Sequence, residues 1–377
     1  MSSTALLRRL AWPSDPGAFR LWLALLVVIH HLTGLEIGKA PVLVFFGLSG
    51  FWVQRVWKDR YRHTRQPWLT FIVSRWWRLA PLLVLATPLA IAMQALTHDR
   101  DLALVAQTPW AHALVPFSVL GYAQLPTRPV GPAWSLDIEM QFYLAAPLLV
   151  ALIARLRTAV ILTLGFLVFE WSLMAHHGVV LTAFLPWFLI GMVAAVHDWR
   201  PSRTMATGSM ALALGLFTAV LATPSLRETY LAPDAPEYVT LNLLLGALLI
   251  PFALSTVTAP RRPDRADALL ADQSFLVYML HWPAITLFRH IEWATPFTAA
   301  LGALTLMAAV AALSMLVWHH FDRPLNRVRK RWVDSRLSEK FGKKEAGDLP
   351  SPDPSDLRIA HPVAPPSPSL VRIDKRS

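Results

Sequence analysis

The 377-residue sequence contains no cysteine, which excludes a disulfide framework, a thiolate nucleophile and thiolate metal ligands. Charged residues are also scarce, at 16% of the chain, whereas ordinary soluble domains carry about 25%. A cleavable secretion leader is not evident, because the first apolar run follows Arg8, Arg9 and Arg20 and lacks a small-residue cleavage site. We therefore expect this first run to be part of the fold.

The sequence is instead rich in long apolar runs. Hydrophobic residues make up 55% of the chain, and apolar runs of 15 to 25 residues recur from Leu21 to Val317. Runs of this length can cross the hydrocarbon core of a bilayer as helices. We predict an all-α integral membrane protein with about ten transmembrane helices, at residues 21–37, 41–56, 70–95, 132–154, 158–175, 179–196, 205–223, 238–257, 274–290 and 297–318.

The distribution of lysine and arginine predicts the orientation of these spans. If the N-terminus is cytoplasmic, the inner loops contain clusters of cations, whereas the outer loops keep only Lys39, Arg100, Arg128, Arg227 and Arg289. The positive-inside rule then places both termini in the cytoplasm. This placement explains the net charge of +11 better than nucleic-acid binding does, so no nucleic-acid partner is expected.

Two apolar or low-complexity stretches fall outside the ten spans. Residues 102–120 are apolar but interrupted at Pro109 and Pro116, which favours a re-entrant or surface helix. The C-terminal stretch has seven prolines between Pro350 and Pro368, so it cannot bury a core and should be disordered. The predicted domains are a cytoplasmic N-terminus at 1–18, a membrane domain at 19–333 and a Pro-rich cytoplasmic tail at 334–377.

The first apolar run, FRLWLALLVVIHHLTG, contains an arginine and two histidines. Arg20 and His31 are eleven residues apart, which is three helical turns plus about 20°, so they share one face of the helix. Along the axis they are separated by roughly 16 Å. Because an arginine and an imidazole are costly in lipid, this face should point into the protein.

Two further segments present small and cationic side chains. In VLVFFGLSGFWVQR, Gly47, Ser49 and Gly50 allow two helices to approach closely, and simple helix packing is their default interpretation. In FIVSRWWRLAPL, Arg75 and Arg78 are three residues apart and project from one helix face. They either snorkel to lipid headgroups or face a cavity that binds the phosphates of a nucleotide-type cofactor. Their position inside the apolar run, beside two tryptophans, favours the cavity.

The segment PAWSLDIEMQFYLAAP places a carboxylate inside the fourth span. Glu139 should lie roughly 7 Å below the outer surface, and at that depth it needs a partner. Tyr143 shares its face, whereas Asp137 points away. Glu139 forms either a structural ion pair or a pair with His31, and the second interpretation would create a site.

The remaining histidines offer little metal chemistry. His281, one turn from Tyr278, is either a satisfied interior histidine or a residue that contacts substrate or supports the site. His30 and His31 are adjacent and cannot form an i, i+4 ligand pair. The pairs His176–His177 and His319–His320 are predicted at opposite membrane surfaces. We therefore expect no metal site.

Taken together, these residues resemble the acyltransferase 3 family of integral membrane acyltransferases. The matching motifs cover about residues 18–331 and are Arg20 with His31, FFGLSGF at 45–51, Arg75 and Arg78 with Leu79 and Pro81, WSLDIEMQFYL at 134–144, and the weaker blocks FLIGMVAA, YMLHWP and FDRP. Leu43 stands where many relatives carry an acidic residue. Many relatives also have a C-terminal SGNH-hydrolase-like domain that this sequence lacks, so a standalone form is expected.

The resemblance implies a multi-pass O-acyltransferase of the bacterial cytoplasmic (inner) membrane. Such an enzyme moves an acyl group, here expected to be acetyl, from cytoplasmic acyl-CoA to a hydroxyl of an extracytoplasmic carbohydrate such as exopolysaccharide or O-antigen. Polysaccharide-assembly proteins are candidate partners. Arg20, Arg75 and Arg78 would hold the CoA phosphates, His31 would be the general base, and Glu139 would orient it. The residues expected to contact substrate or support the site are Ser49, Trp134, Ser135, Tyr143 and His281.

Composition alone leaves a second class open, a multi-span transporter or flippase for a glycolipid or small solute. The ordered set of motifs favours the acyltransferase. The presence of Arg20, His31 and Glu139 argues against a third class, a homologue that has lost catalysis.

Overall fold

The computed structural model describes residues 13–33, 35–175, 178–231, 237–259 and 264–337. Most of the predicted cytoplasmic N-terminus and nearly all of the predicted tail lie outside these ranges. Across the described residues the regular structure is helical, apart from one isolated antiparallel bridge between Thr64 and Leu337. The architecture is therefore all-α, as predicted.

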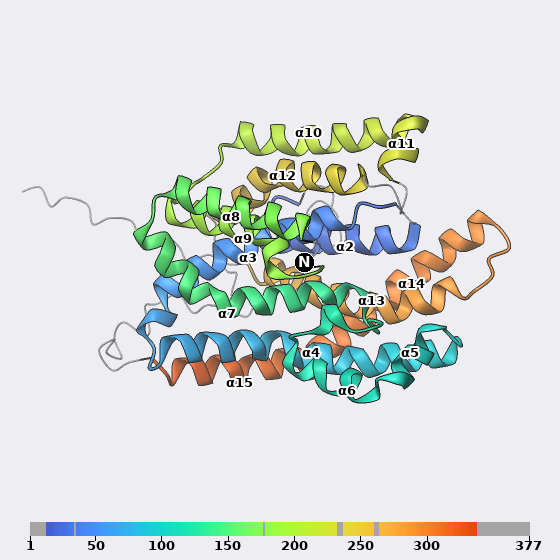
Figure 1. Ribbon diagram of the computed structural model, residues 1–377. Helices are drawn as coiled ribbons and strands as arrows, with labels where there is room; N and C mark the ends of the chain where they lie inside the picture. Colours follow the sequence, from blue (N-terminus) through green and yellow to red (C-terminus); the bar gives the residue numbers. More distant parts are fainter. Residues whose placement is uncertain (1–12, 34, 176–177, 232–236, 260–263, 338–377) are drawn as a thin grey trace, which may run out of the picture.

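The long helices lie side by side and run roughly along one direction (Figure 1). They are α2 (Pro16–Thr33), α3 (Lys39–Asp59), α4 (Pro67–Leu96), α7 (Trp134–Arg155), α8 (Thr158–Met174), α9 (Leu185–Val196), α10 (Arg203–Ala222), α12 (Glu237–Thr258), α13 (Arg265–Arg289) and α14 (Pro296–Val317). A π-helical stretch, Trp318–Asp322, joins α14 to α15 (Arg323–Asp334). The shorter elements are α5 (Asp101–Gln107), α6 (Pro109–Ser118), α11 (Pro224–Tyr230) and 3-10 turns at Tyr61–His63, Tyr122–Gln124, Gly131–Ala133 and Leu181–Ala183.

A helix occupies each of the ten ranges predicted to cross the membrane. Seven helical segments in the described chain are long and apolar enough to do so: Pro16–Thr33, Lys39–His63, Pro67–Leu96, Gly131–Arg155, Arg203–Ala222, Glu237–Thr258 and Pro296–Asp334. The helices α8 and α9 are apolar but shorter, and α13 is not among the seven. The protein thus has several apolar helices that can span a bilayer, while the number of ten crossings and their sidedness stay predictions.

Residues 102–120 do not form one continuous helix. They divide into α5 and α6, with the break at Thr108 and Pro109. At 1.5 Å per residue these helices measure only about 10 and 15 Å, too short to cross a hydrocarbon core of about 30 Å. The pair lies beside α4 (Figure 1), and the Trp76 indole N–H donates to the Phe117 carbonyl at 2.6 Å. This arrangement agrees with the predicted re-entrant or surface helix.

Glycines allow the helices that carry the predicted site to pack backbone against backbone. Gly191 of α9 lies against the Gly47 carbonyl of α3, and Gly50 lies against the Phe188 carbonyl, so a methyl group at either glycine would collide with backbone atoms. Close approach through small residues is a standard way to associate membrane helices. The packing role predicted for Gly47 and Gly50 is therefore confirmed.

The first helix is fixed in the same way against α13. Gly17 contacts the Asp267 backbone, and the Asp267 carboxylate accepts hydrogen bonds from the Gly17 and Ala18 amides, both at 3.0 Å. A carboxylate at a helix N-terminus satisfies free N–H groups and complements the helix dipole. This contact sets the axial position of α2, and hence of Arg20 and His31.

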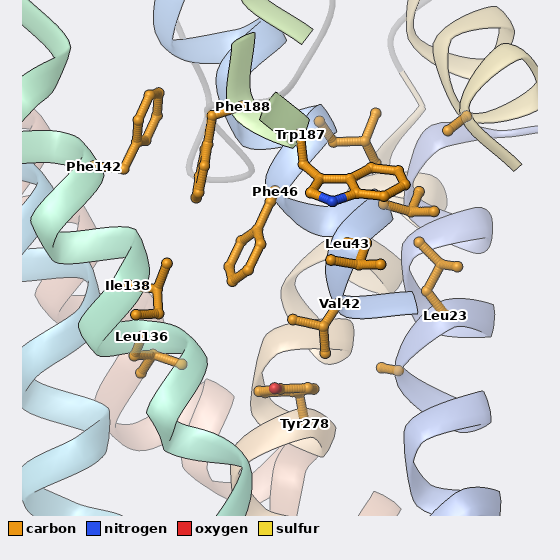
Figure 2. Close-up of a cluster of buried hydrophobic side chains, with 14 of the residues drawn as sticks. Leu23, Val42, Leu43, Phe46, Leu136, Ile138, Phe142, Trp187, Phe188 and Tyr278 are labelled. Carbon is orange, nitrogen blue, oxygen red and sulfur yellow. The ribbon is translucent and has the colours of Figure 1, made fainter. Parts of the chain in front are cut away.

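Aromatic side chains fill the space between α3, α7 and α9. Figure 2 shows Phe46, Phe142 and Phe188 together in this cluster. Phe188 stacks on Phe142 at 4.0 Å and on Phe46 at 4.6 Å between ring centroids. This cluster positions the helix faces that carry Ser49 and Glu139.

Candidate active site

A cavity that is partly open to solvent lies among α2, α3, α4, α7 and α13. Its wall combines apolar side chains with nine polar ones: Arg20, Ser49, Arg75, Arg78, Ser135, Glu139, Tyr143, Ser274 and Tyr278. The structure thus brings seven of the ten predicted site residues together.

The three arginines come from two helices and line the same cavity. Arg20 lies in the second turn of α2, and its buried Nε has no hydrogen-bond partner among the described residues. Arg75, only 6% exposed, has its guanidinium carbon 5.4 Å from the Tyr61 and Phe71 rings and 5.8 Å from Tyr143. Stacking on aromatic rings suits arginine because its guanidinium is planar and weakly hydrated. Arg75 thus lines a cavity, and the binding of phosphates there stays a prediction.

Arg78 completes this cationic wall, with its guanidinium carbon 5.4 Å from the Phe275 ring of α13. The three-residue spacing from Arg75 places both side chains on the cavity side of α4, as the sequence predicted. Guanidinium groups present paired N–H donors that match the geometry of phosphate and carboxylate oxygens. The cavity is therefore chemically suited to a polyanionic ligand.

Glu139 belongs to this cavity and not to the histidines. Its carboxylate accepts hydrogen bonds from the Ser49 hydroxyl at 3.0 Å and from the Tyr143 hydroxyl. The Ser49 and Tyr143 oxygens are themselves 3.5 Å apart. Ser49, Glu139 and Tyr143 thus form one hydrogen-bonded group in the wall of the cavity that the arginines also line.

Ser135 and Tyr278 line another part of the cavity. Their hydroxyl oxygens are 2.8 Å apart, and both lie within hydrogen-bond distance of the Pro132 carbonyl, at 3.0 and 3.1 Å. The predicted site residue Trp134 does not line the cavity. Its ring packs on Phe184 at 5.3 Å and on the cavity residue Phe46 at 6.3 Å, so it supports the wall from behind.

His31 lies in a second group, in the last turn of α2. Its ring is stacked on His281 with centroids 5.6 Å apart, and it meets Trp282 in an edge-to-face contact at 4.9 Å. His281 is fully buried, with Nδ1 3.0 Å from the Val277 carbonyl. Arg289 donates to the His31 backbone carbonyl at 3.0 Å. His31 is therefore held by aromatic faces rather than by a carboxylate.

The pairing of His31 with Glu139 that the sequence suggested does not form in the described structure. The Glu139 carboxylate accepts from Ser49 and Tyr143, whereas the His31 ring contacts His281 and Trp282. Tyr278 connects the two groups, because it lines the cavity and its ring lies 6.2 Å from the His281 ring. The site thus has a cationic part and a histidine part.

No group of three or more His, Cys, Asp or Glu side chains is placed to hold a metal ion in the ranges that the structure describes. His30, adjacent to the candidate base, has a structural contact instead. Its Nδ1 lies 2.6 Å from the Leu35 carbonyl oxygen and 3.9 Å from the Glu36 carboxylate. These contacts stabilise the connection between α2 and α3. This contact was not predicted from the sequence.

Comparison with known proteins identifies the family. A model of the acyltransferase 3 family, described as an acyltransferase domain, matches residues 16–319. The chain belongs to the acyltransferase 3 family. A protein of Komagataeibacter xylinus named "Putative membrane-bound transacylase BcsY" is 28% identical over 330 residues, which cover 78% of this chain and 76% of that protein. No solved structure matches the chain. Together with the apolar helices, these findings identify a membrane acyltransferase.

All cavity residues of this acyltransferase fall within the matched range 16–319. The match ends inside the π-helical stretch, so α15 lies beyond it. Reasoning from the sequence did not identify several residues that line or contact the site, above all Tyr61, Ser274 and Phe275. They carry no local signal, since a tyrosine in a basic loop or a serine in an apolar helix is common.

Proposed function

We propose that this acyltransferase moves an acyl group, acetyl in the simplest case, from acyl-CoA to a hydroxyl of a carbohydrate. The observation that carries the proposal is the cavity in which Arg20, Arg75 and Arg78 converge. Coenzyme A is a polyanion with a diphosphate and a further phosphate. Guanidinium groups bind such oxygens through short, charge-assisted hydrogen bonds.

In this proposal the two parts of the site hold the two ends of the donor. The three arginines bind the phosphates, and the pantetheine arm extends along α2 over the roughly 16 Å to His31. The thioester is then presented at the histidine part. An extended donor explains why the arginines and the histidine share a helix face without sharing a cavity.

His31 is the proposed general base, because imidazole has an ordinary pKa close to neutrality. It takes the proton from the acceptor hydroxyl as that oxygen attacks the thioester carbonyl. The carbon–sulfur bond breaks, the acyl ester forms, and CoA leaves as a thiolate that is reprotonated, which regenerates neutral His31. His281 and Trp282 hold the imidazole in place through their ring contacts.

Glu139 has a different proposed role from the one expected from the sequence. Its carboxylate accepts from Ser49 and Tyr143, so it orients two hydroxyls and partly balances the positive charge of the arginines. It acts on the donor end of the site. Ser135 and Tyr278 line the route between the two parts.

The cellular setting follows from the same scheme. Acyl-CoA is cytoplasmic, so the end of the bundle with the clustered cations would face the cytoplasm of a bacterial inner membrane. The acceptor would be an extracytoplasmic carbohydrate such as exopolysaccharide or O-antigen, and polysaccharide-assembly proteins would be partners. The relative named as a membrane-bound transacylase is consistent with transfer at a membrane.

The test is label transfer by the full-length protein in lipid vesicles, using acetyl-CoA labelled in the acetyl group and a surface-glycan extract. We expect CoA release and labelled glycan, both abolished in His31→Ala and retained in the control His320→Ala, whose side chain is exposed. Label bound to the protein only when His31 is present would indicate an acyl-histidine intermediate. Movement of a glycolipid across the vesicle without CoA release would overturn the proposal in favour of a flippase.

A further inference from the structure

Helix α15 (Arg323–Asp334) is attached to the start of α4 and to the loop that precedes it. It runs along α4 in Figure 1. Arg60 forms an ion pair with Asp334, the Arg65 amide donates to the Arg336 carbonyl at 2.7 Å, and Trp77 lies 6.2 Å from Trp332. These contacts hold α15 at a defined place beside the cationic part of the site.

One arginine of α15 differs from its neighbours. Arg327 and Arg331 are exposed, as expected of a basic helix at a membrane surface. Arg329 is only 1% exposed; its Nη1 donates to the Ser74 hydroxyl at 2.9 Å and its Nε donates to the Asn326 amide oxygen at 3.2 Å. Burying a guanidinium is costly unless its donors are satisfied, so this position is not explained by surface anchoring.

The hydrogen bonds continue from Arg329 to the cavity. The Ser74 and Tyr61 hydroxyl oxygens are 2.8 Å apart, and Arg75 Nη2 donates to the Tyr61 oxygen at 3.5 Å. Arginine can only donate. The Ser74 oxygen therefore accepts from Arg329 and the Tyr61 oxygen accepts from Arg75, while either hydroxyl can donate the hydrogen bond between the two. The series runs from Arg329 through Ser74 and Tyr61 to Arg75.

We propose that Arg329 is a positioning residue for donor binding and that α15 is part of the acyl-CoA site. Arg329 fixes Ser74 and Tyr61, and Tyr61 in turn holds Arg75 by its hydroxyl and by its ring, 5.4 Å from the guanidinium carbon. The inference rests on the proposed function, because Arg75 is the residue through which it would act. Arg329 lies beyond the matched part of the chain.

The experiment compares Arg329→Gln with the matched control Arg327→Gln, both in the full-length protein in lipid vesicles. We expect Arg329→Gln to raise the KM for acetyl-CoA about tenfold, the effect of one charge-assisted hydrogen bond, with kcat within about twofold. Arg327→Gln should leave both unchanged, and Arg329→Lys should recover part of the loss because it restores the charge.

Tyr61→Phe separates positioning from a general packing role, because it keeps the ring and removes only the oxygen. It should also raise the KM for acetyl-CoA, and its effect should not add to that of Arg329→Gln. Two outcomes would overturn the inference while leaving acyl transfer by the wild type intact. One is an unchanged KM in both variants, and the other is a lower yield of folded protein whose KM for acetyl-CoA is unchanged. If the wild type neither binds nor uses acyl-CoA, the proposed function fails, and the inference fails with it.

Discussion

The Glu139 carboxylate accepts a hydrogen bond from the Ser49 hydroxyl at 3.0 Å, on the cavity side of α7. This bond links Glu139 to a second side chain of the cavity that the three arginines line, whereas His31 contacts the His281 and Trp282 rings. The charged and titratable side chains of the site therefore fall into two groups. A carboxylate lies with three guanidiniums at one end, and an imidazole lies among aromatic rings at the other.

Glu139→Gln should therefore affect donor binding more than turnover. Glutamine can still accept from Ser49 and Tyr143, but it removes the negative charge from the cavity that the arginines line. We expect a change in the KM for acetyl-CoA with kcat reduced less than about tenfold, because a carboxamide keeps the hydrogen bonds. Steady-state kinetics at saturating donor provide the measurement. A fall of about 10⁴ in kcat, as when a carboxylate that orients a catalytic histidine is lost, would instead link Glu139 directly to His31.

His31→Ala should abolish transfer and still bind CoA. The imidazole lies about 16 Å along α2 from Arg20, so its loss should leave the proposed phosphate contacts in place. Calorimetry with CoA should give a Kd within about threefold of the wild-type value, which corresponds to less than 1 kcal/mol. Loss of binding together with activity would show that His31 contributes to the donor site or to the fold.

Arg75→Lys should weaken donor binding although the charge is kept. Lysine lacks the planar fork and cannot stack between Tyr61, Phe71 and Tyr143 as the guanidinium does. We expect the Kd for CoA to rise about tenfold or more, equivalent to about 1.5 kcal/mol. Arg155→Lys, at the end of α7 and outside the cavity lining, is the control and should bind as the wild type does. Equal binding by both variants would contradict a specific role for Arg75.

Gly191→Ala should lower stability, because a methyl group there would meet the Gly47 backbone of α3. Overpacking of this kind costs about 1–3 kcal/mol. The matched change Gly215→Ala on α10 has open space around the new methyl group and should be neutral or slightly stabilising through helix propensity. Thermal unfolding of the two variants in detergent makes the comparison. A Gly191→Ala protein as stable as the wild type would show that α3 and α9 can separate without loss.

Much of the fold could be predicted because its signals are local. Apolar runs of spanning length gave the helix ranges, and Pro109 indicated the break between α5 and α6. The common face of Arg75 and Arg78 follows from helix periodicity alone. The partner of Glu139 could not be predicted in the same way. Glu139 lies five residues after the start of α7, but this does not tell which residues of α2 lie beside it. The axial position of α2 is set by Asp267, about 250 residues away in the chain.

The sequence by itself determined the all-helical apolar architecture, the face shared by Arg20 and His31, and the family resemblance, because each depends on composition or on spacing within one helix. Only the tertiary structure decided which polar groups meet. It joined Glu139 to Ser49 and Tyr143, placed His31 against His281 and Trp282, and carried Arg329 of α15 to Ser74. These contacts depend on how distant helices are displaced along one another. That displacement is set by the packing of glycines and aromatic rings between helices, which no spacing within one segment reveals.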